Sequence, residues 1–280
     1  MSPAPRQVAN HGVHWPGFRS ASSVEAQVRR VQGRGGTVAR DEVLIRSVQV
    51  RFIYPDGSEL RCPLADAPDL PFESFLPCRK ISHHKSQRNA PAWYWSSTIN
   101  QMIEYESFLE RVWMTLLDFD PDVSAFSAQP MQLIGADTQG TWKATPDLFV
   151  RRSDGSATVM EVKNPRHLAD PEVQLTAARV AACCRAAGWG YELVGEPPDR
   201  QRTTNILMLM SGYRREMTGA AQYRDLILAA AADPTPIGTL AEAVEEPLVG
   251  RAVVLHLCSL GDLVLDLSAP LEDSTLVRSA

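Results

Sequence analysis

Two acids and a lysine flank one short polar turn in the middle of the chain. The stretch from Thr145 to Lys163 reads TPDLFVRRSDGSATVMEVK, in which the apolar runs LFV and ATVMEV lie on either side of an Asp-Gly pair. Such runs around Asp-Gly predict a β-hairpin. Asp147 comes just before the first strand of this hairpin, and Glu161 and Lys163 come at the end of the second.

The length of the turn decides whether these charges can meet. With a two-residue turn at Asp154-Gly155, Asp147 and Glu161 would lie on opposite faces of the sheet. With a three-residue loop from Ser153 to Gly155, whose glycine is left-handed, Asp147 lies directly across from Glu161 and Lys163 points the same way. We favour the three-residue loop, because two carboxylates beside an ammonium form a cation site with its own counter-charge.

A cation site of this kind suits phosphodiester hydrolysis. Mg²⁺ takes oxygen ligands, usually one or two carboxylates together with phosphate and water. A neighbouring lysine can orient the attacking water or help to deprotonate it. The spacing of Pro-Asp and Glu-x-Lys resembles the PD-(D/E)xK nuclease signature. The alternative reading is a turn followed by an exposed strand edge with an ordinary ion pair.

Two further acids lie upstream on a predicted helix. From Ser97 to Leu117, apolar residues fall largely at three- and four-residue steps, which predicts an amphipathic helix, at least from Tyr105 onward. Glu106 and Glu110 are one turn apart on it, so one face carries two acids beside the apolar stripe. The alternative is that these acids simply face solvent.

The surrounding pattern predicts an α/β fold with a mixed central sheet flanked by helices. The predicted elements, in order, are a hairpin of 42–54 and 58–64 that we interpret as a small accessory sheet, an extended segment 125–134, a loop 135–140, the central hairpin, a helix 171–187 and a strand 191–194. Beyond residue 200, four helices and a short strand pair suggest a winged-helix-like module. Its last helix, Leu248 to Leu260, has a single arginine, which favours protein docking over DNA reading.

Charge is distributed unevenly along the 280 residues, whose net charge is −5. Residues 1–92 hold 13 Lys and Arg against 8 Asp and Glu, whereas the remainder holds 15 against 25. Basic residues followed by the aromatic trio Trp93-Tyr94-Trp95 suit a DNA backbone. The alternative is a solvated loop before a core-facing aromatic cluster. The basic candidates are Arg79, Lys80, Lys85 and Arg88.

Composition and low-complexity stretches set the expected organisation. Residues 1–40 are rich in Pro, Gly, Ser and Arg, which predicts a disordered arm. We expect the accessory hairpin and basic connector at 41–92, the catalytic domain at 93–200 and the docking domain at 201–280. There is no apolar run of membrane-spanning length and no apolar signal core, so we expect a soluble cytoplasmic protein.

Five ordered blocks sharpen the nuclease resemblance. With their order and spacing, they resemble the catalytic region of TnsA-like endonuclease subunits of heteromeric transposases over about residues 93–195. The blocks are Glu-Ser-Phe-Leu-Glu (106–110), Leu-Asp-Phe-Asp-Pro-Asp-Val (117–123), Gln129-Pro130, Thr145-Pro146-Asp147 and Glu161-Val162-Lys163.

The resemblance implies a restriction-endonuclease-like fold and a Mg²⁺-dependent enzyme, with Mn²⁺ as a substitute ion, that nicks the 5′ strands of double-stranded DNA at transposon ends. Asp147 and Glu161 would be the central metal ligands, Glu110 (or Glu106) the helix acid, and Lys163 the catalytic lysine. A DDE-type transposase subunit and an AAA+ ATPase regulator would be the partners. The rivals are a stand-alone restriction or repair nuclease and a catalytically silent DNA-binding scaffold.

Overall fold

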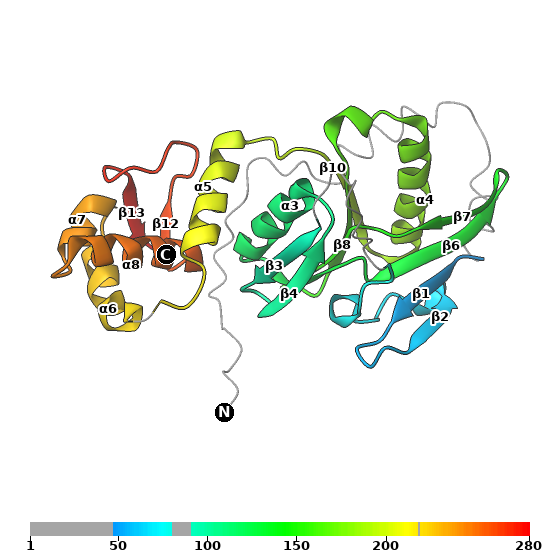
Figure 1. The fold of residues 1–280 in the computed structure, drawn as a ribbon, viewed down its shortest axis with the longest axis horizontal. Helices are drawn as coiled ribbons and strands as arrows, with labels where there is room; N and C mark the ends of the chain where they lie inside the picture. Colours follow the sequence, from blue (N-terminus) through cyan, green and yellow to red (C-terminus); the bar gives the residue numbers. More distant parts are fainter. Residues whose placement is uncertain (1–46, 80–90, 218) are drawn as a thin grey trace.

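The computed structural model describes residues 47–79, 91–217 and 219–280. This part of the chain is mixed α/β, with four β-sheets and six α-helices (Figure 1). The sheets that contain β1 to β10 lie toward one end of the elongated molecule, and α5 to α8 lie at the other. The predicted disordered arm, residues 1–40, lies outside the described residues.

A mixed four-stranded sheet carries the central hairpin, as the sequence predicts. Strand order is β10-β9-β8-β5, in which β10 runs parallel to β9 and the other neighbours are antiparallel. Two helices cover its faces, because alternate residues of each strand point to opposite sides. The elements are α3 (Phe108–Phe119), β5 (Val123–Ala128), β8 (Leu148–Arg152), β9 (Ala157–Val162), α4 (Pro171–Ala187) and β10 (Gly190–Val194).

Each face of this sheet contributes to a different apolar core. Leu148 and Met160 are fully buried in one core with Met114 of α3. Phe149 and Val159, their neighbours along the two strands, are buried in another core with residues of α4. Since both faces are apolar, a one-residue slip in register would exchange the two sets of side chains, and the register is therefore strongly specified.

The central hairpin has the predicted three-residue loop. Leu148 pairs with Met160 and Arg151 with Ala157, and the N–H of Arg152 donates to the carbonyl of Ser156 at 2.9 Å. Gly155 has a φ of +86°, the left-handed conformation that such a loop requires. One step beyond Leu148 and Met160, this register sets Asp147 across from Glu161.

The N-terminal hairpin is not a separate accessory sheet, which corrects our interpretation. Strands β1 (Gln49–Ile53) and β2 (Glu59–Pro63) form the expected hairpin, but β1 also pairs with β6 (Met131–Asp137), and β6 pairs with β7 (Gly140–Ala144). The predicted loop 135–140 is thus largely strand. The reason is burial: alternate apolar residues of β1 and β6 share the core under α4. The 3-10 helices η1 (Leu64–Asp66), η2 (Phe72–Ser74) and η3 (Pro165–His167) complete this half.

The predicted helix from Ser97 to Leu117 was wrong over its first half. Strands β3 (Ala92–Ser96) and β4 (Gln101–Tyr105) form a second hairpin, and α3 begins only at Phe108. Asn100 has a φ of +53°, so an asparagine supplies the left-handed residue of the turn without a glycine to signal it. Ile103 pairs with Tyr94 and packs in the same apolar core as α3. It is therefore apolar because its strand faces that helix, and its position in the sequence happened to continue the helical pattern.

The C-terminal unit has its own apolar core. The four predicted helices and the antiparallel terminal strand pair are confirmed, and β11 extends the pair to three strands in the order β11-β13-β12. Helices α7 and α8 approach so closely that a Cβ on Gly250 would lie 2.1 Å from the carbonyl oxygen of Ala241. The elements are α5 (Arg200–Gly212), α6 (Ala220–Ala230), β11 (Thr235–Pro236), α7 (Ile237–Glu242), α8 (Pro247–Leu260), β12 (Leu263–Leu265) and β13 (Leu276–Ser279).

Specific contacts join this unit to the sheets. Helix α5 packs against α3, and Leu116 and Phe119 of α3 pack against the apolar core of the C-terminal unit. Arg214, just after α5, donates to the carbonyl of Trp95 at 2.6 Å. Among the helices within the described ranges, none has both the length and the apolar character needed to cross a membrane.

Candidate active site

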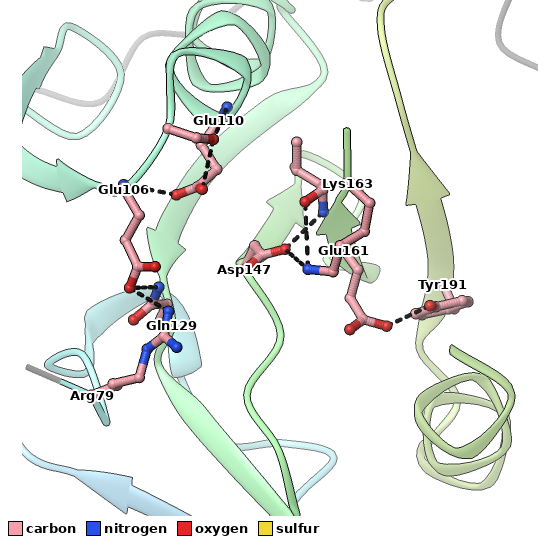
Figure 2. Close-up of polar contacts among 10 residues, drawn as sticks. Arg79, Glu106, Glu110, Gln129, Asp147, Glu161, Lys163 and Tyr191 are labelled. Carbon is pink, nitrogen blue, oxygen red and sulfur yellow. Dashed lines mark hydrogen bonds and ion pairs between the residues drawn. The ribbon is translucent and has the colours of Figure 1, made fainter. Parts of the chain in front are cut away.

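Asp147 is held at the point where three strands of the central sheet end. Its backbone carbonyl accepts the N–H of Gln129 at 2.9 Å. Its carboxylate Oδ2 accepts the backbone N–H of Val162 at 2.8 Å and an N–H of the Lys163 ammonium at 2.9 Å (Figure 2). The side chain is only 12% exposed. The hairpin register therefore delivers the predicted aspartate–lysine pair in a largely buried position.

Lys163 is a cation in this arrangement. Burial by itself would lower the pKa of the ammonium, but the carboxylate of Asp147, followed by those of Glu161 and Glu110, outweighs burial, so that the pKa is raised. A raised pKa keeps Lys163 charged at neutral pH. The side chain is suited to stabilise negative charge on a substrate, because a protonated amine cannot accept a proton from water.

Glu161 is buried, but its carboxylate does not face Asp147. The residue is 4% exposed, and its Oε2 accepts the hydroxyl of Tyr191 at 2.5 Å. Figure 2 shows the side chain turned toward Tyr191 of β10, while Asp147 faces Lys163. A hydroxyl donor relieves a buried carboxylate that would otherwise lie against a second one. The two acids therefore share a register position as predicted, whereas their carboxylates diverge.

Glu110 lies in the first turn of α3, is 8% exposed and forms a capping box. The hydroxyl of Ser107 accepts the N–H of Glu110 at 3.2 Å and donates to its Oε1 at 2.7 Å, and the N–H of Glu106 donates to Oε2 at 3.0 Å. Burial raises the pKa of Glu110, and the nearby charge of Asp147 raises it further. This carboxylate thus belongs to the same electrostatic site as Asp147 and Lys163.

Glu106, the alternative helix acid, is engaged elsewhere. Its carboxylate pairs with the guanidinium of Arg79 and accepts an N–H from Nε2 of Gln129 at 3.0 Å. Of the predicted DNA-binding residues, Arg79 is therefore ion-paired and about half exposed. The other three, Lys80, Lys85 and Arg88, lie outside the described residues.

The sequence analysis did not predict that the side chains of two residues, Tyr191 and Gln129, contact the acids of this site. Tyr191 was placed on a strand, but its contact with Glu161 depends on the parallel pairing of β10 and β9. Gln129 was noted only as part of a motif block. It is 3% exposed and has a φ of +50°, and it links Glu106 to the backbone of Asp147. A left-handed glutamine has no signature in a sequence.

Mg²⁺ fits the donor chemistry of the site. Among the residues that the structure describes, no three Asp, Glu, His or Cys side chains are grouped closely enough to hold a metal ion. Even so, the charges of three acids, Asp147, Glu161 and Glu110, act on one lysine. Burial raises the pKa of Glu110 and of Glu161, and the charge of Asp147 raises both further. Carboxylates, completed by phosphate and water, are the ligands that Mg²⁺ prefers.

Comparison with known proteins does not place the chain in a family. No protein-family model matches it, and no curated protein matches its sequence significantly.

Proposed function

We propose that this protein is a Mg²⁺-dependent DNA endonuclease that hydrolyses phosphodiester bonds at transposon ends, nicking the 5′ strands, as a subunit of a heteromeric transposase. The observation that carries the proposal is the contact of Lys163 with Asp147, at 2.9 Å, at the register position opposite Glu161 and within the electrostatic reach of Glu110. Acid, acid and lysine from one hairpin, with a helix acid beside them, are the residues that the TnsA-like resemblance requires.

The fold supports the same proposal. The order α3-β5-β8-β9-α4-β10, with the hairpin in the middle of a mixed sheet and a helix on each face, suits a restriction-endonuclease-like core. Three helices followed by a β-hairpin, α6 to β13, suit a winged-helix-like module. The helix before its hairpin, α8, is buried over most of its length. That burial speaks against α8 as a DNA reader, and docking on the transposase or its ATPase regulator is the role that the TnsA-like resemblance implies for the module.

Each side chain then has a definite task. Asp147, Glu161 and Glu110 would hold the ion, for which the carboxylate of Glu161 must leave Tyr191. Bound Mg²⁺ would supply Lewis acidity toward the scissile phosphate. Lys163 donates hydrogen bonds to the phosphate oxygens on which charge develops. Asp147 keeps the ammonium in place, and the backbone N–H of Val162 fixes the carboxylate of Asp147.

A catalytically silent DNA-binding subunit is the second candidate. The observation that favours it is the hydrogen bond between Glu161 and Tyr191, which leaves the two hairpin carboxylates apart. A silent subunit would keep this arrangement with DNA and Mg²⁺ present, whereas an active one would not.

The test is cleavage of a DNA duplex with a transposon end, in Mg²⁺, with the transposase and ATPase encoded by neighbouring genes. We expect the wild type to nick the 5′ strand and Lys163→Ala to lose about 100- to 1,000-fold in rate. Lys143→Ala, an exposed lysine of β7, is the matched control and should cleave normally. Undiminished cleavage by Lys163→Ala would remove the proposed site, and absence of cleavage by every form would favour the silent subunit.

A further inference from the structure

The β3–β4 hairpin presents one face to α3 and leaves the other largely open. Tyr94 and Ser96 point inward and are buried. Trp93 and Trp95 point outward, as do their partners on β4, which are Glu104 and Met102. Trp93 and Met102 are 59% and 52% exposed, whereas Trp95 and Glu104 are half-buried. We call Trp93, Trp95 and Met102 the tryptophan face. Large apolar side chains on a well-paired strand, open to solvent, call for a partner.

Arginines border the tryptophan face. The guanidinium groups of Arg214 and Arg215 lie over the ring of Trp95, 5.6 and 5.4 Å from its centroid. Arg214 also donates to the Trp95 carbonyl, and its guanidinium lies 4.6 Å from the ring centroid of Tyr94. Arg214 therefore fixes β3 to the C-terminal unit. Arg215 is exposed. The face therefore combines rigid aromatic surface with positive charge.

The same pairing recurs at the start of α3. Phe108, three residues beyond β4, is 66% exposed, and the guanidinium of Arg111 lies 5.7 Å from its ring centroid. Neither Arg111 nor Arg215 forms an ion pair with another residue of the described ranges. Their charges are consequently available to a partner that carries negative charge.

We infer that the tryptophan face binds unpaired nucleotides of a DNA strand, stacking a base on the exposed ring of Trp93 and pairing phosphates with Arg215, whose guanidinium is held over the ring of Trp95. Single-strand binding sites combine stacking aromatics with cations along the backbone. An exposed ring favours a single strand over a duplex, since the bases of a duplex are already stacked on their neighbours. This inference rests on the proposed function only in taking DNA as the polymer.

The experiment measures binding without cleavage. Fluorescein-labelled dT20 and a 20-base-pair duplex are titrated with the full chain in EDTA, and binding is followed by fluorescence anisotropy. We expect the single strand to bind more tightly than the duplex. Trp93→Ala should weaken single-strand binding about tenfold, Trp93→Phe should retain most of it, and duplex binding should change little. Arg215→Ala should reduce the dependence of binding on salt.

Controls separate this inference from the nuclease. Leu248→Ala removes an even more exposed apolar side chain, 86% exposed, from α8 and should bind as the wild type does. Wild-type single-strand affinity in Trp93→Ala would overturn the inference and leave the face to a protein partner. Loss of cleavage in Lys163→Ala is independent of either result.

Discussion

Each end of α3 carries one buried carboxylate, and the two carboxylates differ in the groups that surround them. Asp118, in the last turn, is 8% exposed. It accepts the hydroxyls of Tyr94 and Ser96 at 2.8 and 2.7 Å and the backbone N–H groups of Ser97 and Thr98 at 2.9 and 2.8 Å. All these donors are neutral and come from the β3–β4 hairpin. Asp118 is thus an anchor that fixes the hairpin turn on the helix.

Glu110, in the first turn, is equally buried but is satisfied less completely. It accepts one hydroxyl and one backbone N–H, and it shares its surroundings with Asp147 and Lys163. The comparison shows that two equally buried carboxylates can lie in different electrostatic surroundings. A carboxylate surrounded by neutral donors is stabilised without an ion, whereas one beside a second acid is stabilised by a nearby cation.

Glu110→Gln tests the chemical end of this comparison and should have the largest effect. Glutamine at this position retains a capping box, so α3 should keep its stability, while the negative charge is lost. We expect Mg²⁺-dependent cleavage to fall at least about 100-fold with little change in Tm. A parallel measurement of cleavage and thermal unfolding decides the matter. A variant that unfolds early but cleaves normally would reverse the roles assigned to the two ends.

Asp118→Asn tests the structural end. Asparagine has one acceptor oxygen, and its NH₂ group faces donors, so several buried hydrogen bonds are lost. We expect a loss of about 2–4 kcal/mol in the free energy of unfolding, measured by chemical denaturation, and normal cleavage per folded molecule. Unchanged stability together with a large loss of cleavage would contradict the assignment of Asp118 as an anchor.

Tyr191→Phe extends the comparison to Glu161, whose single neutral donor is the Tyr191 hydroxyl. Burial raises the pKa of Glu161, and the hydrogen bond from Tyr191 opposes that rise. Loss of the hydroxyl should therefore raise the pKa of Glu161 further. We expect half-maximal cleavage at a lower Mg²⁺ concentration, measured by titrating rate against Mg²⁺, because Glu161 no longer has to leave the Tyr191 hydroxyl to reach the ion. Tyr223→Phe, on α6, is the control. An unchanged Mg²⁺ titration in Tyr191→Phe would show that the hydroxyl does not position Glu161.

The smallest expected effect is a pH-dependent change in stability at Glu192 of β10. Burial raises the pKa of its carboxyl, against the opposing attraction of Arg152. With a folded-state pKa above the unfolded value, this group stabilises the fold at low pH, and that contribution is lost as pH rises through the folded-state pKa. Glu192→Gln should therefore raise Tm at pH 7 by on the order of 1–3 °C, with the difference shrinking near pH 4.5. A lower Tm at pH 7 would mean that the attraction of Arg152 dominates.

The sequence was informative where a local signal fixed a long-range contact. Asp154-Gly155 predicted the loop, the loop set the register, and the register placed Asp147 across from Glu161. The mixed sheet and the C-terminal helices followed equally from periodicity and from glycine and proline signals.

Other features depended on contacts that no local pattern encodes. The turn at Asn100 has no glycine, and Met102 and Ile103 stand at helical spacing from Ile99, so a strand was assigned to a helix. The direction of the Glu161 side chain depends on Tyr191, thirty residues away on a parallel strand. The pairing of β1 with β6 likewise joins two strands that lie far apart in the sequence.

The hydrogen bond from Arg214 to β3 limits where the chain can be cut to produce a folded fragment. Leu116 and Phe119 of α3 pack against the core of the C-terminal unit, and the carbonyl of Trp95 is hydrogen-bonded by a residue that follows α5. A fragment that stops before α5 would expose these apolar side chains and release the hairpin. The shortest fragment that keeps the half with the candidate site intact must therefore continue at least through Arg214, well past Val194, where the last strand of that half ends.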